Sequence, residues 1–136
     1  MAILDNTLAA GPGDEPPAKP ARPLLACLCA AWCDTCTAYR PSVQALAQSH
    51  PGWQVVWVDI EDQADALASL PGGEPDIDNF PTLLVCSADG HGFFGTVLPH
   101  ASLLARLLHQ ASQGELPALD ADALALAALL RSGRVA

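Results

Sequence analysis

Residues 24–36 read LLACLCAAWCDTC and decide the fold of this chain. The apolar first half of this stretch follows a proline and precedes a tryptophan, as expected of a short strand that is buried on both faces. A helix can begin near Asp34 and run to about Ser49, which is typical of a strand followed directly by a helix. This passage from strand to helix places Cys33 at the positive end of the helix and Cys36 one turn further on.

The hydrophobic pattern after residue 50 predicts six more elements. They are a strand over 53–60, a short acidic helix over 62–70, strands over 82–86 and 92–98, a helix over 99–111 and a final Ala/Leu-rich helix within about 115–132. An Asp-Gly pair joins the third and fourth strands and indicates a hairpin. The order β-α-β-α-β-β-α-α predicts an α/β fold with a mixed sheet and helices on both faces.

The first residues differ in composition from the rest of the chain. Residues 11–23 contain five prolines and two glycines, which remove backbone donors and favour extended or turn conformations. We therefore expect residues 1–23 to form a flexible arm. Residues 24–136 then form a single domain that includes the added C-terminal helix.

Composition and charge exclude several classes of partner. The chain has 136 residues, of which 51% are hydrophobic and 15% charged, as in folded domains. Six Lys and Arg against fifteen Asp and Glu give a formal charge of −9, whereas nucleic acids and anionic membranes require a basic surface. No apolar run is long enough to span a bilayer, and the opening MAILDN lacks the pattern of a secretory signal. We expect a cytoplasmic protein with no nucleic-acid or membrane partner.

The cysteines are the strongest chemical signal. The chain has five, and Cys27, Cys29, Cys33 and Cys36 lie within ten residues. In a reducing compartment such a cluster is more often catalytic or metal-binding than structural. A thiolate rather than a thiol attacks a disulfide, and a helix N-terminus stabilises negative charge. The spacing therefore favours Cys33 as nucleophile and Cys36 as the thiol that resolves the mixed disulfide.

Three further features join this motif. They are Trp32 directly before Cys33, Pro41 five residues after Cys36, and the run Phe80-Pro81-Thr82 leading into a strand. Together with the strand and helix around the cysteines, these features resemble the thioredoxin family over roughly residues 24–112. The resemblance implies a thioredoxin-like three-layer sandwich whose first βα unit is abbreviated here, because the proline-rich leader has no room for it.

The resemblance also implies an activity and a substrate groove. Pro81 is expected to be cis, and Phe80, whose main chain would pair with a bound peptide, shapes the groove with Pro81 and Trp32. The activity implied is dithiol-disulfide exchange that reduces protein disulfides, without a bound cofactor. A thioredoxin reductase is the reducing partner that the resemblance implies.

Three positions depart from the family pattern. Cys27 stands six residues before the nucleophile, where thioredoxins carry a buried carboxylate that helps to deprotonate the resolving cysteine. A thiol has a pKa near 8.5, against about 3.9 for an Asp, so Cys27 is not an equivalent base at neutral pH. Trp57 stands where a lysine accompanies that acid, and the pair between the cysteines is Asp34-Thr35 rather than Gly-Pro. We expect Cys27 and Asp34 to tune the protonation of the active thiols.

The charge distribution predicts a substrate preference. Between Arg40 and Arg106 the chain has no Lys or Arg, and it has eight acidic residues there. If Pro81 lies beside Cys33, the residues Glu74, Asp76, Asp78 and Asp34 would surround the nucleophile. Like charge disfavours a thiolate, which makes the dithiol more reducing. The same acidic rim should favour substrates with basic or neutral flanks.

Simpler explanations stand beside these. Cys33 and Cys36 could be half of a metal site, or the four clustered cysteines a zinc or iron-sulfur site, although the flanking tryptophan and helix favour redox chemistry. In the same simpler interpretation, Cys27, Cys29 and Cys86 are small buried packing residues. The four histidines show no ligand spacing, so no metal is expected. In a second class of function, a non-catalytic thioredoxin-like adaptor or chaperone would hold a partner in the groove.

Overall fold

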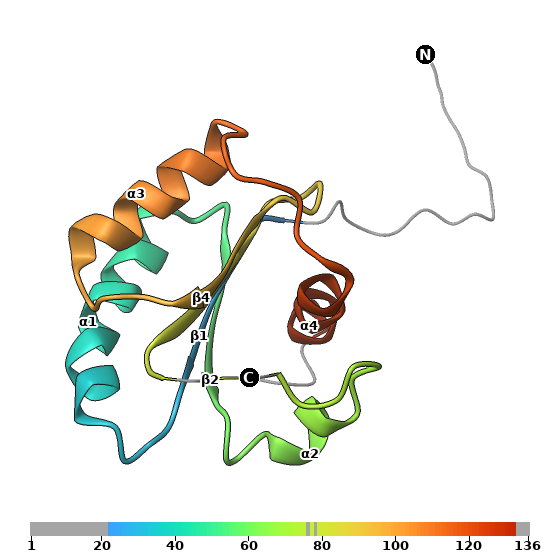
Figure 1. Ribbon diagram of the computed structural model, residues 1–136. Helices are drawn as coiled ribbons and strands as arrows, with labels where there is room; N and C mark the ends of the chain where they lie inside the picture. Colours follow the sequence, from blue (N-terminus) through green and yellow to red (C-terminus); the bar gives the residue numbers. More distant parts are fainter. Residues whose placement is uncertain (1–21, 76, 78, 133–136) are drawn as a thin grey trace, which may run out of the picture.

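The computed structural model describes residues 22–75, 77 and 79–132. Figure 1 shows their strands and helices. In chain order these are β1 (Leu24–Cys29), α1 (Asp34–Ser49), β2 (Gln54–Asp59), α2 (Ala64–Ala68), β3 (Thr82–Cys86), β4 (Gly92–Thr96), α3 (Ala101–Ser112) and α4 (Ala121–Arg131). This order confirms the prediction, with element ends that mostly move by one to three residues.

The strands form one mixed sheet in the order β2-β1-β3-β4. β1 runs parallel to β2 and antiparallel to β3, which pairs antiparallel with β4. Helices α1 and α3 cover one face of this sheet, and α2 and α4 cover the other (Figure 1). The predicted three-layer α/β architecture is therefore confirmed.

The central strand β1 supplies both halves of the core. All six of its residues are buried. Leu24, Ala26 and Leu28 belong to the core on the α2–α4 face, whereas Leu25, Cys27 and Cys29 belong to the core on the α1–α3 face. Because side chains alternate along a strand, Cys27 and Cys29 share one face, as the sequence predicts.

The last helix completes the α2–α4 face. Helix α2 has only five residues, and Ala123, Leu126 and Leu130 of α4 pack onto the sheet beside it. This confirms the prediction that the helix is an additional cover for the sheet. The helix begins at Ala121 rather than near 115, because Asp120 caps it by accepting a hydrogen bond from the Ala123 backbone N–H at 2.8 Å.

Two sequence expectations lie partly outside the described residues. The flexible arm predicted over 1–23 falls almost wholly on residues 1–21, and Asp76 and Asp78 of the predicted acidic rim are also outside. None of the helices in the described part of the chain has the length and hydrophobicity needed to cross a membrane.

Candidate functional site

Cys33 lies at the N-terminal end of α1. A turn closed by the hydrogen bond from the Cys33 N–H to the Ala30 carbonyl, at 3.0 Å, reverses the chain after β1. Cys33 is the N-cap residue, and no side chain caps the helix there. The first N–H groups of a helix lack partners within it, so they and the helix dipole favour an anion at this position. Cys33 is half-buried, whereas Cys36 is buried.

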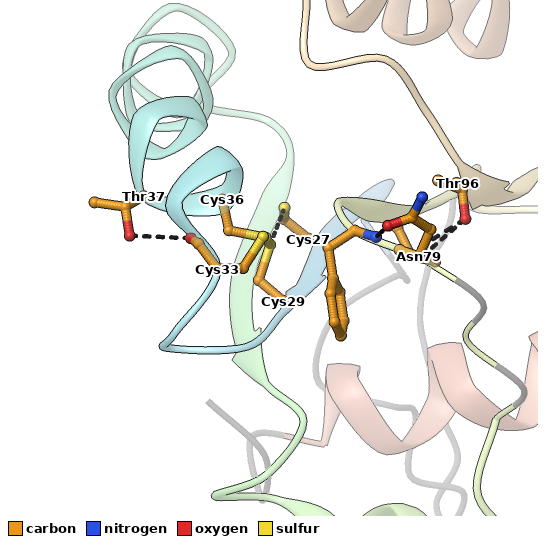
Figure 2. Close-up of a disulfide and its surroundings, with 9 residues drawn as sticks. Cys27, Cys29, Cys33, Cys36, Thr37, Asn79 and Thr96 are labelled. Carbon is orange, nitrogen blue, oxygen red and sulfur yellow. Dashed lines mark hydrogen bonds between the residues drawn. A yellow bond between two sulfur atoms is a disulfide. The ribbon is translucent and has the colours of Figure 1, made fainter.

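Cys36 is bonded to Cys29 and not to Cys33. The two Cα atoms lie 6.0 Å apart, within the usual range for a disulfide. Cys27, Cys33 and Cys86 are free thiols. Cys29, expected to be a buried packing residue, is indeed buried but is also half of this disulfide. Figure 2 shows the four clustered cysteines where β1 passes into α1.

Cys27 is a neighbour of the disulfide without taking part in it. Its Sγ lies 3.6 Å from Cys29 Sγ, within range of a weak S–H···S hydrogen bond. Burial raises the pKa of the Cys27 thiol to about 12, so it stays protonated at neutral pH. Burial, with the nearby Cys27, also raises the pKa of Tyr39. Cys27 therefore does not replace the buried carboxylate of thioredoxins as a base.

Aromatic side chains form a wall beside Cys33. The Trp32 ring meets the Phe80 ring edge to face, with 5.6 Å between centroids. Trp32 is 66% exposed, and its indole N–H donates to Glu61 Oε2 at 3.0 Å. The Phe80–Pro81 peptide bond is cis, as the family resemblance predicts. The structure thus brings Trp32 and Phe80 together, and Pro81, the next residue after Phe80, is buried.

Asn79 belongs to this region and was missed from the sequence. Its side-chain Oδ1 accepts a hydrogen bond from the Phe80 N–H at 2.8 Å, and its carbonyl accepts one from Thr82 Oγ1 at 2.7 Å. The backbone donor of Phe80 is therefore occupied by a neighbouring side chain. An Asn directly before Phe80-Pro81 was the available signal, because Asn side chains commonly bond nearby backbone.

A cavity of about 380 Å³ reaches Cys36 from the side of β2. Its lining includes Cys36, Arg40, Trp57 and Asp59. The Arg40 guanidinium carbon lies 5.0 Å from the centre of the Trp57 ring, in cation-π range. Trp57 is half-buried and serves both the core and this cavity. The positive charge of Arg40 and the carboxylates of Asp59 and Asp62 therefore line the space next to Cys36.

Of the four residues predicted to form an acidic rim around Cys33, the structure describes Asp34 and Glu74. Asp34 is exposed in the first turn of α1, and Glu61 is tied to Trp32. Glu74 lines a cavity together with Asp120 and Asp122 of the α4 segment, in the α2–α4 layer. Among residues 22–75, 77 and 79–132, no group of three or more His, Cys, Asp or Glu is arranged to hold a metal ion.

Comparisons with known proteins match the fold. No family model and no curated protein matches the sequence. The structure is similar to thioredoxin O2 from Arabidopsis thaliana in its oxidized state, at 19% identity over 65% of this chain and 74% of that one, with a TM-score of 0.51. It is similar to Fasciola hepatica thioredoxin, at 21% identity over 66% and 81%, with a TM-score of 0.52. It is also similar to thioredoxin NaTrxh from Nicotiana alata, at 17% identity over 66% of this chain and 73% of that one, with a TM-score of 0.54. The fold is therefore thioredoxin-like.

Proposed function

We propose that this protein is a thiol-disulfide oxidoreductase that reduces protein disulfides through Cys33 and Cys36. The observation that carries the proposal is a half-buried thiol, Cys33, at the start of α1, with the disulfide-bonded sulfur of Cys36 one turn further along the helix. The thioredoxin-like fold supports the same chemistry. The disulfide to Cys29 shows Cys36 in an oxidised state.

The reaction follows from these positions. In the reduced protein, the Cys33 thiolate attacks one sulfur of a substrate disulfide, and the substrate S–S bond breaks. One substrate sulfur leaves as a thiolate and takes up a proton, while the other is joined to Cys33. Cys36 then attacks Cys33 Sγ, the second substrate thiol leaves, and Cys33 and Cys36 hold the disulfide. Two electrons have passed from the protein to the substrate.

Deprotonation of Cys36 needs an acceptor other than Cys27. The cavity beside Cys36 supplies one route, because Asp59 lines it and the space is large enough for water. Asp59 accepts hydrogen bonds from the backbone N–H groups of Glu61 and Asp62, at 2.9 and 3.1 Å. These bonds hold its carboxylate in place at the end of β2.

The groove and the partners belong to the same proposal. Trp32, Phe80 and Pro81 would form the surface against which a substrate peptide lies, and Asp34 would tune the thiolate. The acidic side chains Asp34 and Glu61 near the turn would favour substrates with basic or neutral flanks. A thioredoxin reductase in the cytoplasm would return electrons to the protein.

A trapping experiment tests the proposal. Without its resolving thiol, the reduced Cys36→Ser variant should accumulate mixed disulfides with a peptide disulfide substrate through Cys33. The Cys33→Ser variant should form none and should not reduce insulin. Cys86→Ala is a matched control, because Cys86 lies in the core on the opposite face of the sheet. Partner binding that survives Cys33→Ser unchanged would instead indicate an adaptor or chaperone.

A further inference from the structure

We infer that Cys29 is a third redox-active residue, so that Cys36 exchanges its disulfide bond between Cys33 at the surface and Cys29 in the core. The inference rests on the proposed function of Cys33 and Cys36. It adds an internal acceptor that stores the oxidised state away from solvent. The family resemblance assigns no such role to this position.

The local geometry puts Cys36 between two sulfur partners. Cys29 is the last residue of β1 and faces the layer that contains α1. The turn over residues 30–32 folds α1 back across the strand end, and the Cys36 side chain reaches Cys29 and is bonded to it. Cys33 packs against the same core cluster from the helix end. Residues three apart on a helix lie on one face, about 5–6 Å apart at Cβ, so Cys33 is also a neighbour of Cys36.

The exchange needs no external oxidant. When substrate reduction has left a Cys33–Cys36 disulfide, the Cys29 thiolate attacks Cys36 Sγ. The Cys29–Cys36 bond forms and the Cys33–Cys36 bond breaks. Cys33 leaves as a thiolate, and the proton given up by Cys29 remains available to it. One disulfide replaces another, so the number of electrons is unchanged.

The exchange changes what the oxidised protein exposes. Cys29 and Cys36 are each about 1% exposed, whereas Cys33 is half-buried. External thiols therefore have poor access to the stored disulfide, and access limits the rate of thiol-disulfide exchange. Reduction would run through Cys33, which attacks Cys36, restores the Cys33–Cys36 disulfide and presents it to the reductant. The oxidised protein keeps a free thiol at its surface.

Cys27 does not compete for this role. Two residues apart on an extended strand, Cys27 and Cys29 have Cα atoms about 6.6 Å apart, at the long end of the range that a disulfide spans. Cys27 is therefore the natural control for a change at Cys29.

Disulfide mapping tests the inference directly. The full-length protein would be oxidised with insulin, blocked with N-ethylmaleimide and cut with chymotrypsin, which cleaves after Leu28, Trp32 and Tyr39. Residues 29–32 (CAAW) then hold Cys29, and residues 33–39 (CDTCTAY) hold Cys33 and Cys36. We expect the two peptides to be joined and to carry maleimide on Cys33. A loop confined to residues 33–39, with maleimide on Cys29, would overturn the inference.

Variants separate this inference from the proposed function. In oxidised Cys33→Ser, the Cys29–Cys36 disulfide should be reduced by glutathione at least about ten-fold more slowly than in the unchanged protein. Oxidised Cys29→Ser should lose the free Cys33 thiol, and Cys27→Ala should keep the joined peptides. Cys29→Ala repeats the test if the serine variant misfolds. If Cys33→Ser still reduces insulin, the proposed function is refuted. If oxidised Cys29→Ser and the unchanged protein carry maleimide on the same cysteines in the 33–39 peptide, only the inference about Cys29 is refuted.

Discussion

Cys27 Sγ lies 3.6 Å from Cys29 Sγ, yet one sulfur is a protonated thiol and the other is half of a disulfide. The two side chains leave the same face of β1, and only Cys29 is at the end of the strand where α1 folds back. Cys27 is enclosed by the α1–α3 core, and this enclosure raises its pKa to about 12. One step along the strand face thus separates a disulfide-bonded sulfur from a free, buried thiol.

The first prediction concerns stability at high pH. An unfolded Cys27 loses its proton near its ordinary pKa of 9.0, whereas the folded protein holds that proton until about pH 12. The folded state therefore binds more protons between these values. Below pH 9, Cys27 should therefore cause no change of the free energy of unfolding with pH. Above pH 9, Cys27 should lower the free energy of unfolding by up to about 1.4 kcal/mol for each pH unit.

Urea unfolding between pH 7.5 and 10.5 would measure this effect. Two proteins would be compared, the Cys33→Ser variant and the same variant with Cys27→Ala added. The Cys33→Ser change prevents exchange of the disulfide in both. The alanine variant should show the smaller loss of stability with rising pH, whatever its stability at neutral pH. Parallel pH curves for the two proteins would contradict the assigned pKa.

The second prediction concerns the positive charge beside Cys36. Arg40 lines the cavity that reaches Cys36, so its positive charge should stabilise the Cys36 thiolate of the dithiol form. Because Arg40 is exposed, the contribution should be about 0.2–1 kcal/mol. For a two-electron couple this is roughly 5–20 mV.

Arg40→Gln should accordingly make the dithiol more reducing, as measured by equilibration with glutathione. Arg106→Gln, at an exposed position on α3, is the matched control for loss of one positive charge. Equal potentials for the two variants would show that Arg40 has no special influence on Cys36.

The third prediction concerns the backbone donor of Phe80. The Asn79 side chain occupies this N–H, which a bound peptide would need if it pairs with Phe80. Asn79→Ala removes the competitor, and one hydrogen bond is worth about 0.5–1.5 kcal/mol, so KM for a peptide disulfide should fall by roughly 2- to 10-fold. Thr96→Ala is the control, because the Thr96 hydroxyl bonds the Asn79 carbonyl and Thr82 Oγ1, whereas the Phe80 N–H bonds Asn79 Oδ1. An unchanged KM would exclude pairing through Phe80.

The fourth prediction concerns α4. Leu130 is fully buried against the sheet, so Leu130→Ala should lower the free energy of unfolding by about 2–5 kcal/mol. Leu124 on the same helix is 40% exposed, and Leu124→Ala should cost less than about 1 kcal/mol. Urea unfolding measures both. Equal effects would mean that α4 does not form part of the core.

The sequence contained enough information for the elements and their layers. The β1 run is apolar at every position, and Leu104, Leu107, Leu108 and Ala111 mark one buried face of α3, as the structure shows. Phe80-Pro81 identified the cis bond through the family resemblance. These features depend on local pattern, which is visible without coordinates.

The disulfide partner of Cys36 depends on the conformation of the turn between β1 and α1, which local sequence pattern does not give. Alternation correctly put Cys27 and Cys29 on one face, but the choice of Cys29 depends on how tightly the turn between Ala30 and Cys33 folds α1 over the strand end. The helix spacing alone favoured Cys33. Asn79 escaped notice for a similar reason, because its bond to the Phe80 N–H depends on the loop conformation.

The helix that closes the second core also affects the order in which the domain can be completed on the ribosome. Leu24, Ala26 and Leu28 are among the first residues of the sheet to be synthesised, and α4, which packs over that face, is the last described element. This face of the nascent sheet therefore stays only partly covered, by α2, until α4 has been synthesised. Chaperone contact during synthesis should concentrate on that surface.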